Sequence, residues 1–227
     1  MKLQSILLVI CLTLFFAGCI FNSDSDYFKG EYLDSYFPLN PKLSSKFLVT
    51  TYVDTVAIQD QIVRSFKGTR EVGDKIYYRL QVNENDKYAY YRIENDILYR
   101  FYDSGEKMFV PRMHEEPLLD FSRQPGETWT AVTSIIPDVE GEIAYTLTVT
   151  FQGVEAINTI AGMFNDCARF DNHETVVYSS VKDENGDPVT LEMNYQTWYA
   201  RGVGLIKLRA EGDIFGTYEI DIYDYSR

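Results

Sequence analysis

The side chains that could do covalent or metal chemistry in this chain are few. The sequence holds three cysteines, Cys11, Cys19 and Cys167, and two histidines, His114 and His173. A nucleophilic cysteine needs a nearby base, and zinc normally takes several His or Cys ligands. Because these residues are so few and so widely separated, we expect no catalytic cysteine and no metal site. Cys19 is then the one cysteine to which the sequence assigns a chemical role.

Cys19 stands at the end of an N-terminal targeting segment. A basic Lys2, an apolar run over 6–16 and the small residues Ala17 and Gly18 precede it, and this order is typical of a secretory signal. The run is shorter than the about 20 apolar residues that span a bilayer. Small residues directly before a Cys resemble the bacterial lipoprotein signal, which implies that residues 1–18 are removed and that Cys19 carries a lipid. The alternative is a cleaved signal without a lipid, in which Cys19 is an ordinary residue.

The lipoprotein resemblance also implies a location. In diderm bacteria an Asp after the lipidated Cys retains lipoproteins at the inner membrane, and Ile20 stands there instead. The resemblance therefore favours the outer membrane. Residues 19–35 are polar and acidic without periodicity, so we expect a flexible tether with a root-mean-square span of roughly 20 Å. With Cys11 removed and Cys19 lipidated, Cys167 has no disulfide partner and is expected to be a small buried side chain.

The charge balance excludes several classes of partner. The chain has 34 Asp and Glu against 21 Lys and Arg, a net charge of −13. Nucleic acid needs a basic face, and attachment to anionic lipid through protein charge needs a basic cluster. We therefore expect no nucleic-acid partner, and membrane contact through the lipid on Cys19.

Motifs for catalysis or cofactors are absent from the sequence. There is no Gly-x-Ser-x-Gly and no phosphate loop, and we expect no cofactor. The segment that begins at Asp183 starts like a calcium loop, but Pro188 and Asn194 stand at its sixth and twelfth positions, where Gly and Glu are needed. It predicts a hairpin turn. A carboxylate pair could hydrolyse glycosides, but the sequence singles out no pair among its acidic residues.

The elements that must position any site are strands. From residue 36 onward, short segments alternate apolar and polar residues with turn residues between them, which is typical of half-buried β-strands. The predicted strands are 47–58, 76–82, 88–93, 97–102, one that begins near Trp129, 143–151, 167–178, 189–199, 205–210 and 216–223. The sequence therefore predicts one antiparallel all-β domain over residues 36–227, built as a curved sheet, a sandwich or a partly open barrel.

Aromatic residues make up 15% of the chain. In the pairs Tyr77-Tyr78 and Tyr90-Tyr91, neighbouring residues must face opposite sides of a sheet. One ring of each pair can enter the core, and the other is left on the second face. Ordinary cross-strand packing is one interpretation. An aromatic face that receives a protein, a glycan or an apolar ligand is the other.

Several short segments resemble a group of uncharacterised bacterial envelope lipoproteins. They are Tyr36-Phe37-Pro38-Leu39, Pro125-Gly126-Glu127-Thr128-Trp129, Ala161-Gly162-Met163-Phe164 and the stretch from Trp198 to Lys207. The group has a Gly-x-x-Trp after its Pro-Leu, and 42–47 depart from that pattern. The resemblance implies a β-rich exported domain and no particular activity.

The sequence thus predicts a lipid-anchored envelope protein, non-enzymatic, that binds or scaffolds another molecule. Two alternatives stay open. One is a carboxylate-dependent hydrolase of an envelope polysaccharide, and the other is a carrier for an apolar ligand, which needs a cavity of roughly 300 Å³ or more.

Overall fold

The computed structural model describes residues 35–40, 42–53, 56–83, 88–103, 113–138, 141–212 and 216–226. The predicted signal peptide 1–18, Cys19 and the tether up to residue 34 lie outside the described residues. Every regular element in the described part of the chain is a β-strand. The strands are β1 (Ser44–Val53), β2 (Val56–Val72), β3 (Lys75–Val82), β4 (Tyr88–Glu94), β5 (Ile97–Asp103), β6 (Met113–Asp120), β7 (Thr128–Asp138), β8 (Gly141–Thr159), β9 (Gly162–Lys182), β10 (Pro188–Ala200), β11 (Gly204–Gly212) and β12 (Thr217–Ser226).

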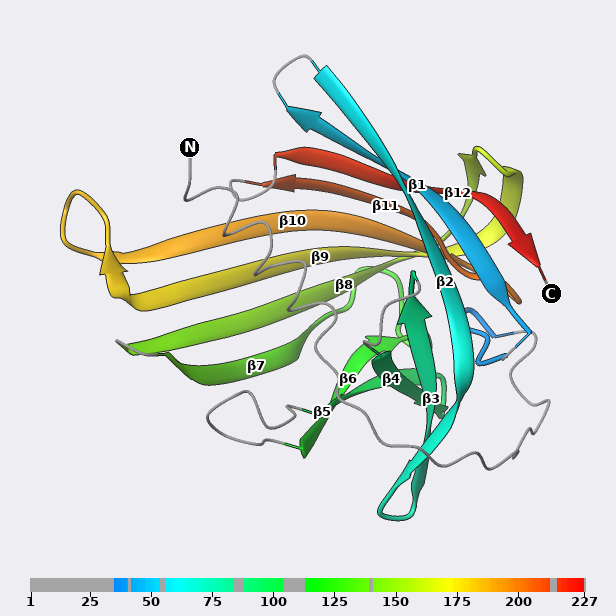
Figure 1. The fold of residues 1–227 in the computed structure, drawn as a ribbon, viewed down its shortest axis with the longest axis horizontal. Coiled ribbons are helices and arrows are strands. Elements are labelled where there is room, and N and C mark those ends of the chain that lie inside the picture. The colour runs from blue at the N-terminus through cyan, green and yellow to red at the C-terminus, as the bar shows by residue number, and fades with distance from the viewer. Residues whose placement is uncertain are drawn as a thin grey trace.

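The twelve strands form one antiparallel sheet in the order β6-β5-β4-β3-β2-β1-β12-β11-β10-β9-β8-β7. Apart from β6 and β7, strands that are consecutive in the sequence pair with each other, and β1 pairs with β12, so the first and last strands meet in the middle of the sheet. The sheet edges, β6 and β7, are also consecutive and lie next to each other. The sheet therefore curls into a nearly closed, barrel-like shape (Figure 1). The predicted all-β antiparallel class is confirmed.

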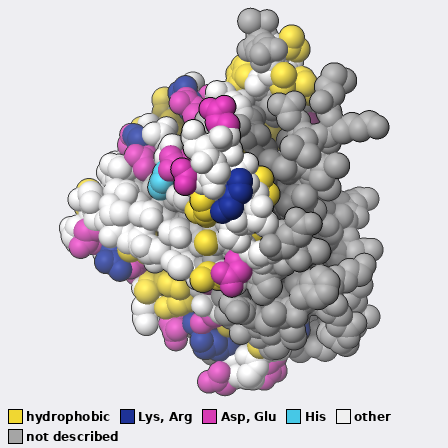
Figure 2. All heavy atoms as spheres, turned by 90° about the vertical axis from the view of Figure 1, so that its left-hand side faces the viewer, with side chains coloured by type: hydrophobic (Ala, Val, Ile, Leu, Met, Phe, Trp, Pro, Cys, Tyr) yellow, Lys and Arg dark blue, Asp and Glu magenta, His cyan; other side chains and the backbone are white. Residues whose placement is uncertain are grey.

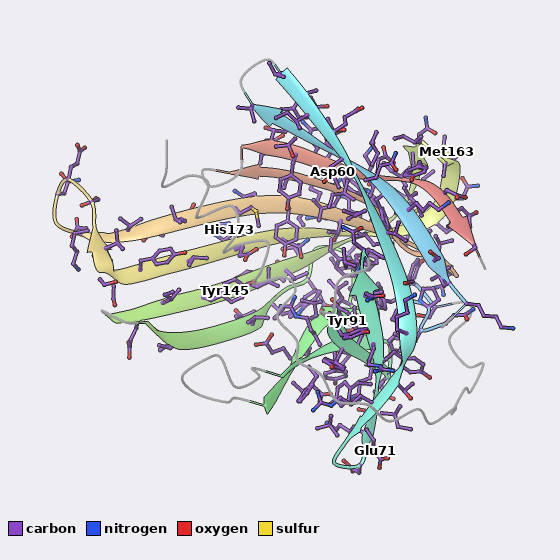
Figure 3. All side chains as sticks on the ribbon, in the orientation of Figure 1. Asp60, Glu71, Tyr91, Tyr145, Met163 and His173 are labelled. Carbon is purple, nitrogen blue, oxygen red and sulfur yellow. The ribbon has the colours of Figure 1, made fainter. Side chains whose placement is uncertain are left out.

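Alternation along the strands builds the core. On β8 the side chains of Leu147, Val149 and Phe151 are buried, whereas Thr148 and Thr150 between them are only partly buried. The same pattern on the other strands brings apolar and aromatic side chains together in one large cluster inside the curled sheet. Tyr91 lies in this region of the molecule (Figure 3). No disulfide is needed, because apolar burial of this extent is the main favourable term in folding.

The segment before β1 closes part of this interior. Tyr36, Phe37 and Leu39 belong to the core cluster. The ring of Phe37 lies 6.2, 5.1 and 6.2 Å from the rings of Phe66, Tyr91 and Tyr199, which come from β2, β4 and β10. The aromatic-Pro-Leu segment is thus an internal plug.

A second cluster lies where the β8–β9 hairpin folds back onto the sheet. Its buried members are Phe47, Cys167, Trp198, Ala200, Val203, Ile206 and Ile222. Ile157 and Phe164, from the two arms of the hairpin, pack against it. The long strands β8 and β9 therefore serve both as part of the sheet and as a cover for its end.

One predicted strand is wrong in its extent. The run 47–58 crosses a hairpin, because β1 ends at Val53 and β2 begins at Val56. The remainder of β2 and all of β6 were not predicted. The first half of β2 is mostly exposed, so it lacks the alternating apolar residues that indicate a strand.

Candidate functional site

The predicted lipid-bearing residue, Cys19, lies outside the described residues, but the structure shows where the described chain begins, at Ser35. The backbone N–H of Gly202, in the β10–β11 turn, donates a hydrogen bond of 2.9 Å to the carbonyl of Ser35. The Arg201 guanidinium lies 4.2 Å from the centre of the Tyr36 ring. No helix in the described part of the chain is long and apolar enough to cross a membrane.

Cys167 is a buried thiol, as expected. Its Sγ lies 3.5 Å from the carbonyl of Phe164 and 3.7 Å from that of Asn165. Burial raises the pKa of the thiol to about 11, so the group is protonated near neutral pH and is a poor nucleophile. Around it, as elsewhere in the described residues, no three His, Cys, Asp or Glu side chains converge as metal ligands.

The tyrosine pairs divide between two faces of the sheet. Tyr78 and Tyr91 are cross-strand partners in the main core, whereas Tyr77 and Tyr90 pack with Phe101 in a small cluster of their own. The rings of Tyr77 and Phe101 are 5.0 Å apart. All four tyrosines are buried. These four rings therefore take part in ordinary packing within the protein, and they do not form an exposed aromatic face.

The turn that starts at Asp183 is a hairpin turn, as predicted. Its Oδ1 accepts backbone N–H groups from Asn185 and Asp187, both at 2.9 Å. These bonds lower the pKa of Asp183, that from Asp187 contributing most. The carboxylate therefore stabilises the turn itself.

A polar groove of about 470 Å³ crosses β8, β9, β10 and β11. Two rows of cross-strand neighbours line it, since alternate residues of these strands face away from the core. One row runs Thr150, Asp171, Gln196, Arg209, and the other runs Thr148, His173, Asn194, Glu211. Each row takes one residue from each of the four strands, and residues on neighbouring strands are in register. His173 and Tyr145 lie along this long part of the sheet (Figure 3).

The charged side chains of the groove are Asp171 on β9 and Arg209 and Glu211 on β11. Arg209 contacts Glu211 at 2.9 Å and Glu219 at 3.8 Å, and Asp171 contacts Arg169 at 3.1 Å. The Oδ1 of Asn194 lies 2.9 Å from Nδ1 of His173. The hydroxyl groups of Thr148 and Thr150 and the amide of Gln196 also line the groove.

Besides the groove, a cluster of polar side chains lies inside the curled sheet. Arg100 and Glu116 face each other across β5 and β6, with Nη2 and Oε2 3.9 Å apart, and the Glu116 side chain is 9% exposed. Glu174 enters from β9 and accepts a hydrogen bond from the hydroxyl of Tyr145. Burial raises the pKa of Glu174, although Tyr145 and Arg100 oppose the rise. Burial also raises the pKa of Tyr195, and the charge of Glu174 adds to the effect.

An apolar cavity next to Phe37 is small. It lies among Phe37, Leu43, Phe47, Phe66 and Leu80 and has a volume of about 30 Å³. That volume holds about one water molecule. This cavity is about a tenth of what a small apolar ligand requires.

Sequence analysis missed both polar clusters. Hydroxyl and amide residues alternate with apolar ones on β8 and β10, and that signal was present in the sequence. Which of them become neighbours depends on the register of four strands, which the sequence pattern does not determine.

No protein-family model matches the chain, and no curated protein sequence matches it. Two solved crystal structures are similar in fold. One is a protein assigned as exported, with a YmcC-like fold, from Bacteroides fragilis, at 12% identity over 86% of this chain and 100% of that one, with a TM-score of 0.49. The other is a protein assigned as a lipoprotein from Parabacteroides distasonis, at 12% identity over 85% of this chain and 99% of that one, with a TM-score of 0.52. The chain therefore shares the overall fold of this second protein.

Proposed function

We propose that this protein is a lipoprotein of the bacterial cell envelope, held at the outer membrane by a lipid on Cys19, and that its β domain is a binding module. The observation that carries the anchor is the sequence Ala17-Gly18-Cys19 after a short apolar run. The shared fold with a protein assigned as a lipoprotein supports it.

The binding half of the proposal rests on the polar groove. Its volume of about 470 Å³ lies in the range of ligand sites. Hydroxyl, amide and imidazole groups line it. They complement the hydroxyl groups of a sugar better than an apolar chain, which would leave them without hydrogen bonds. The ligand that fits is a glycan of the envelope.

The hydrolase alternative would use Glu116 and Glu174 as its carboxylate pair. We favour the binding module, because Glu116 is buried and lies opposite Arg100.

Two experiments test the proposal. Cys19→Ser should abolish metabolic labelling with a fatty acid and release the protein from membranes, and labelling that survives the substitution would refute the anchor. For the groove, titration with envelope polysaccharide fragments should show binding that Asn194→Ala with Gln196→Ala weakens. Glu192→Ala is the matched control, because Glu192 is exposed on the same strand but does not line the groove. Equal affinity in both variants would refute the assignment of the groove.

A further inference from the structure

The tip of the β8–β9 hairpin exposes apolar side chains. The turn lies at Ile160 and Ala161, where the Thr159 hydroxyl donates a hydrogen bond of 3.0 Å to the carbonyl of Gly162. Val154, Ile160 and Met163 are 52%, 56% and 63% exposed. Ile157 and Phe164, on the same hairpin, instead pack against the second cluster. The tip thus has one face fixed to the protein, and its exposed apolar side chains lie in solvent together with Asn158, the cross-strand partner of Met163.

The tip is held firmly against the end of β12. The N–H of Ala161 donates to the carbonyl of Ile222 at 2.9 Å, and the N–H of Ile160 donates to the Asp221 carboxylate at 3.3 Å. The rings of Phe164 and Tyr225 are 5.8 Å apart. The backbone of the tip is therefore fixed before binding, and the tip loses little further backbone entropy when it binds a partner.

This tip lies at the end of the molecule where the tether arrives. Tyr225, which contacts Phe164, is the cross-strand partner of Ser45 at the start of β1. Val203, next to the Gly202 that binds Ser35, belongs to the cluster on which Phe164 packs. Figure 1 shows the hairpin beside the C-terminal end of β12, and Figure 3 places Met163 there.

We infer that the β8–β9 tip rests in the apolar boundary of the membrane to which Cys19 is anchored, and so orients the groove away from the bilayer. The inference rests on the proposed lipid anchor. Residues 19–34 precede Ser35, and a tether of that length has a root-mean-square span of roughly 22 Å. The tip therefore stays close to the bilayer at a high effective concentration, and a few apolar side chains suffice for contact.

The charge of the protein selects the kind of lipid. The net charge is −13, and Glu155 and Asp166 near the tip are exposed. An acidic protein is repelled by anionic headgroups, so the contact is with zwitterionic lipid and is driven by apolar burial.

A second hairpin provides a matched control. Val56 and Ile58 at the β1–β2 tip are 60% and 56% exposed. Figure 2 shows hydrophobic side chains gathered at the top of the molecule, where Figure 1 places this hairpin. The tip lies at the far end of β1, a strand of 10 residues, about 33 Å from the end at which the tether arrives.

The test uses the full-length lipidated protein in phosphatidylcholine vesicles, with Met163→Cys carrying an environment-sensitive fluorophore. Cys167 is buried and Cys19 carries the lipid, so the label attaches at position 163. We expect a blue shift and strong quenching by spin-labelled lipid at position 163, little of either at Val56→Cys, and loss of the quenching when Ile160→Asp is added.

Vesicle flotation, measured on the same samples, separates the two proposals. Flotation with no quenching at 163, or with stronger quenching at 56, overturns the orientation by the tip and leaves the anchor intact. Failure to float overturns the anchor, and the inference falls with it.

Discussion

Glu115→Gln should destabilise the folded protein. Glu115 on β6 binds side chains of β3 and β4, and together these four residues, Lys75, Tyr77, Arg92 and Glu115, form a polar network. The Glu115 carboxylate accepts hydrogen bonds from Lys75 at 2.7 Å, from the Tyr77 hydroxyl at 2.6 Å and from two nitrogens of Arg92, one at 2.8 Å. Burial of the carboxylate would by itself raise its pKa, but these donors outweigh burial and lower the pKa of Glu115 from 4.5 to about 2. The charged form is therefore stabilised by the fold.

The size of the effect follows from that shift. A depression of this size corresponds to roughly 3 kcal/mol of folding stability if the whole shift is realised. Water reaches the network at Lys75, whose side chain is partly exposed, so screening reduces the contribution to about 2 kcal/mol. Because the folded pKa is depressed, the contribution is complete above the unfolded pKa of about 4.5 and is lost as pH falls through about 2.

The assay is urea unfolding, followed by tryptophan fluorescence at several pH values. Glu115→Gln should lower the free energy of unfolding by about 2 kcal/mol at pH 7, and the difference from wild type should shrink as the pH approaches 2. Glu94→Gln is the control: its carboxylate also binds Arg92, at 2.8 Å, but is 57% exposed, against 18% for Glu115. Equal losses in both variants, or a loss for Glu115→Gln that does not depend on pH, would refute the reasoning.

Two further predictions concern the interior. Burial raises the pKa of Glu174 above 4.5. The stability of the wild-type protein should therefore fall as the pH rises from about 4.5 through the pKa of Glu174 in the folded state, and Glu174→Gln should lack that fall. Melting temperatures measured between pH 4 and 8 test this, and a constant difference between the two proteins would contradict it. Phe37→Ala should cost about 3 to 5 kcal/mol of unfolding free energy, because it removes the ring that packs on Phe66, Tyr91 and Tyr199. The control is Ile135→Ala, at an exposed position, which should cost about 0.5 kcal/mol or less in the same urea titration. A similarly small loss for Phe37→Ala would show that Phe37 is not part of the folded core.

Strand character was predictable where one face is buried. The alternation over 143–151 appears as part of β8, with Leu147, Val149 and Phe151 in the core. The same method failed at β2, whose first half is exposed on both faces and therefore carries no alternating pattern. The same method also predicted one strand over 47–58, where the structure has β1 and β2, because the residues on both sides of the turn between them are similarly β-branched.

The candidate site was predictable only in part. The anchor prediction depends on a contiguous segment around Cys19, and contiguous signals can be recognised without a structure. The groove depends on Thr150, Asp171, Gln196 and Arg209 coming into register from four strands. A shift of one residue in any pairing would turn its side chains to the other face.

By itself, the sequence determined the β class of the domain and the chemistry available to it, because periodicity and composition are local properties. Only the tertiary structure decided that β1 pairs with β12, that Phe37 fills the interior, and that the β8–β9 tip packs against β12. The Ser45–Tyr225 pairing joins the first strand to the last. Such contacts depend on the folding of the whole sheet, and no local pattern specifies them.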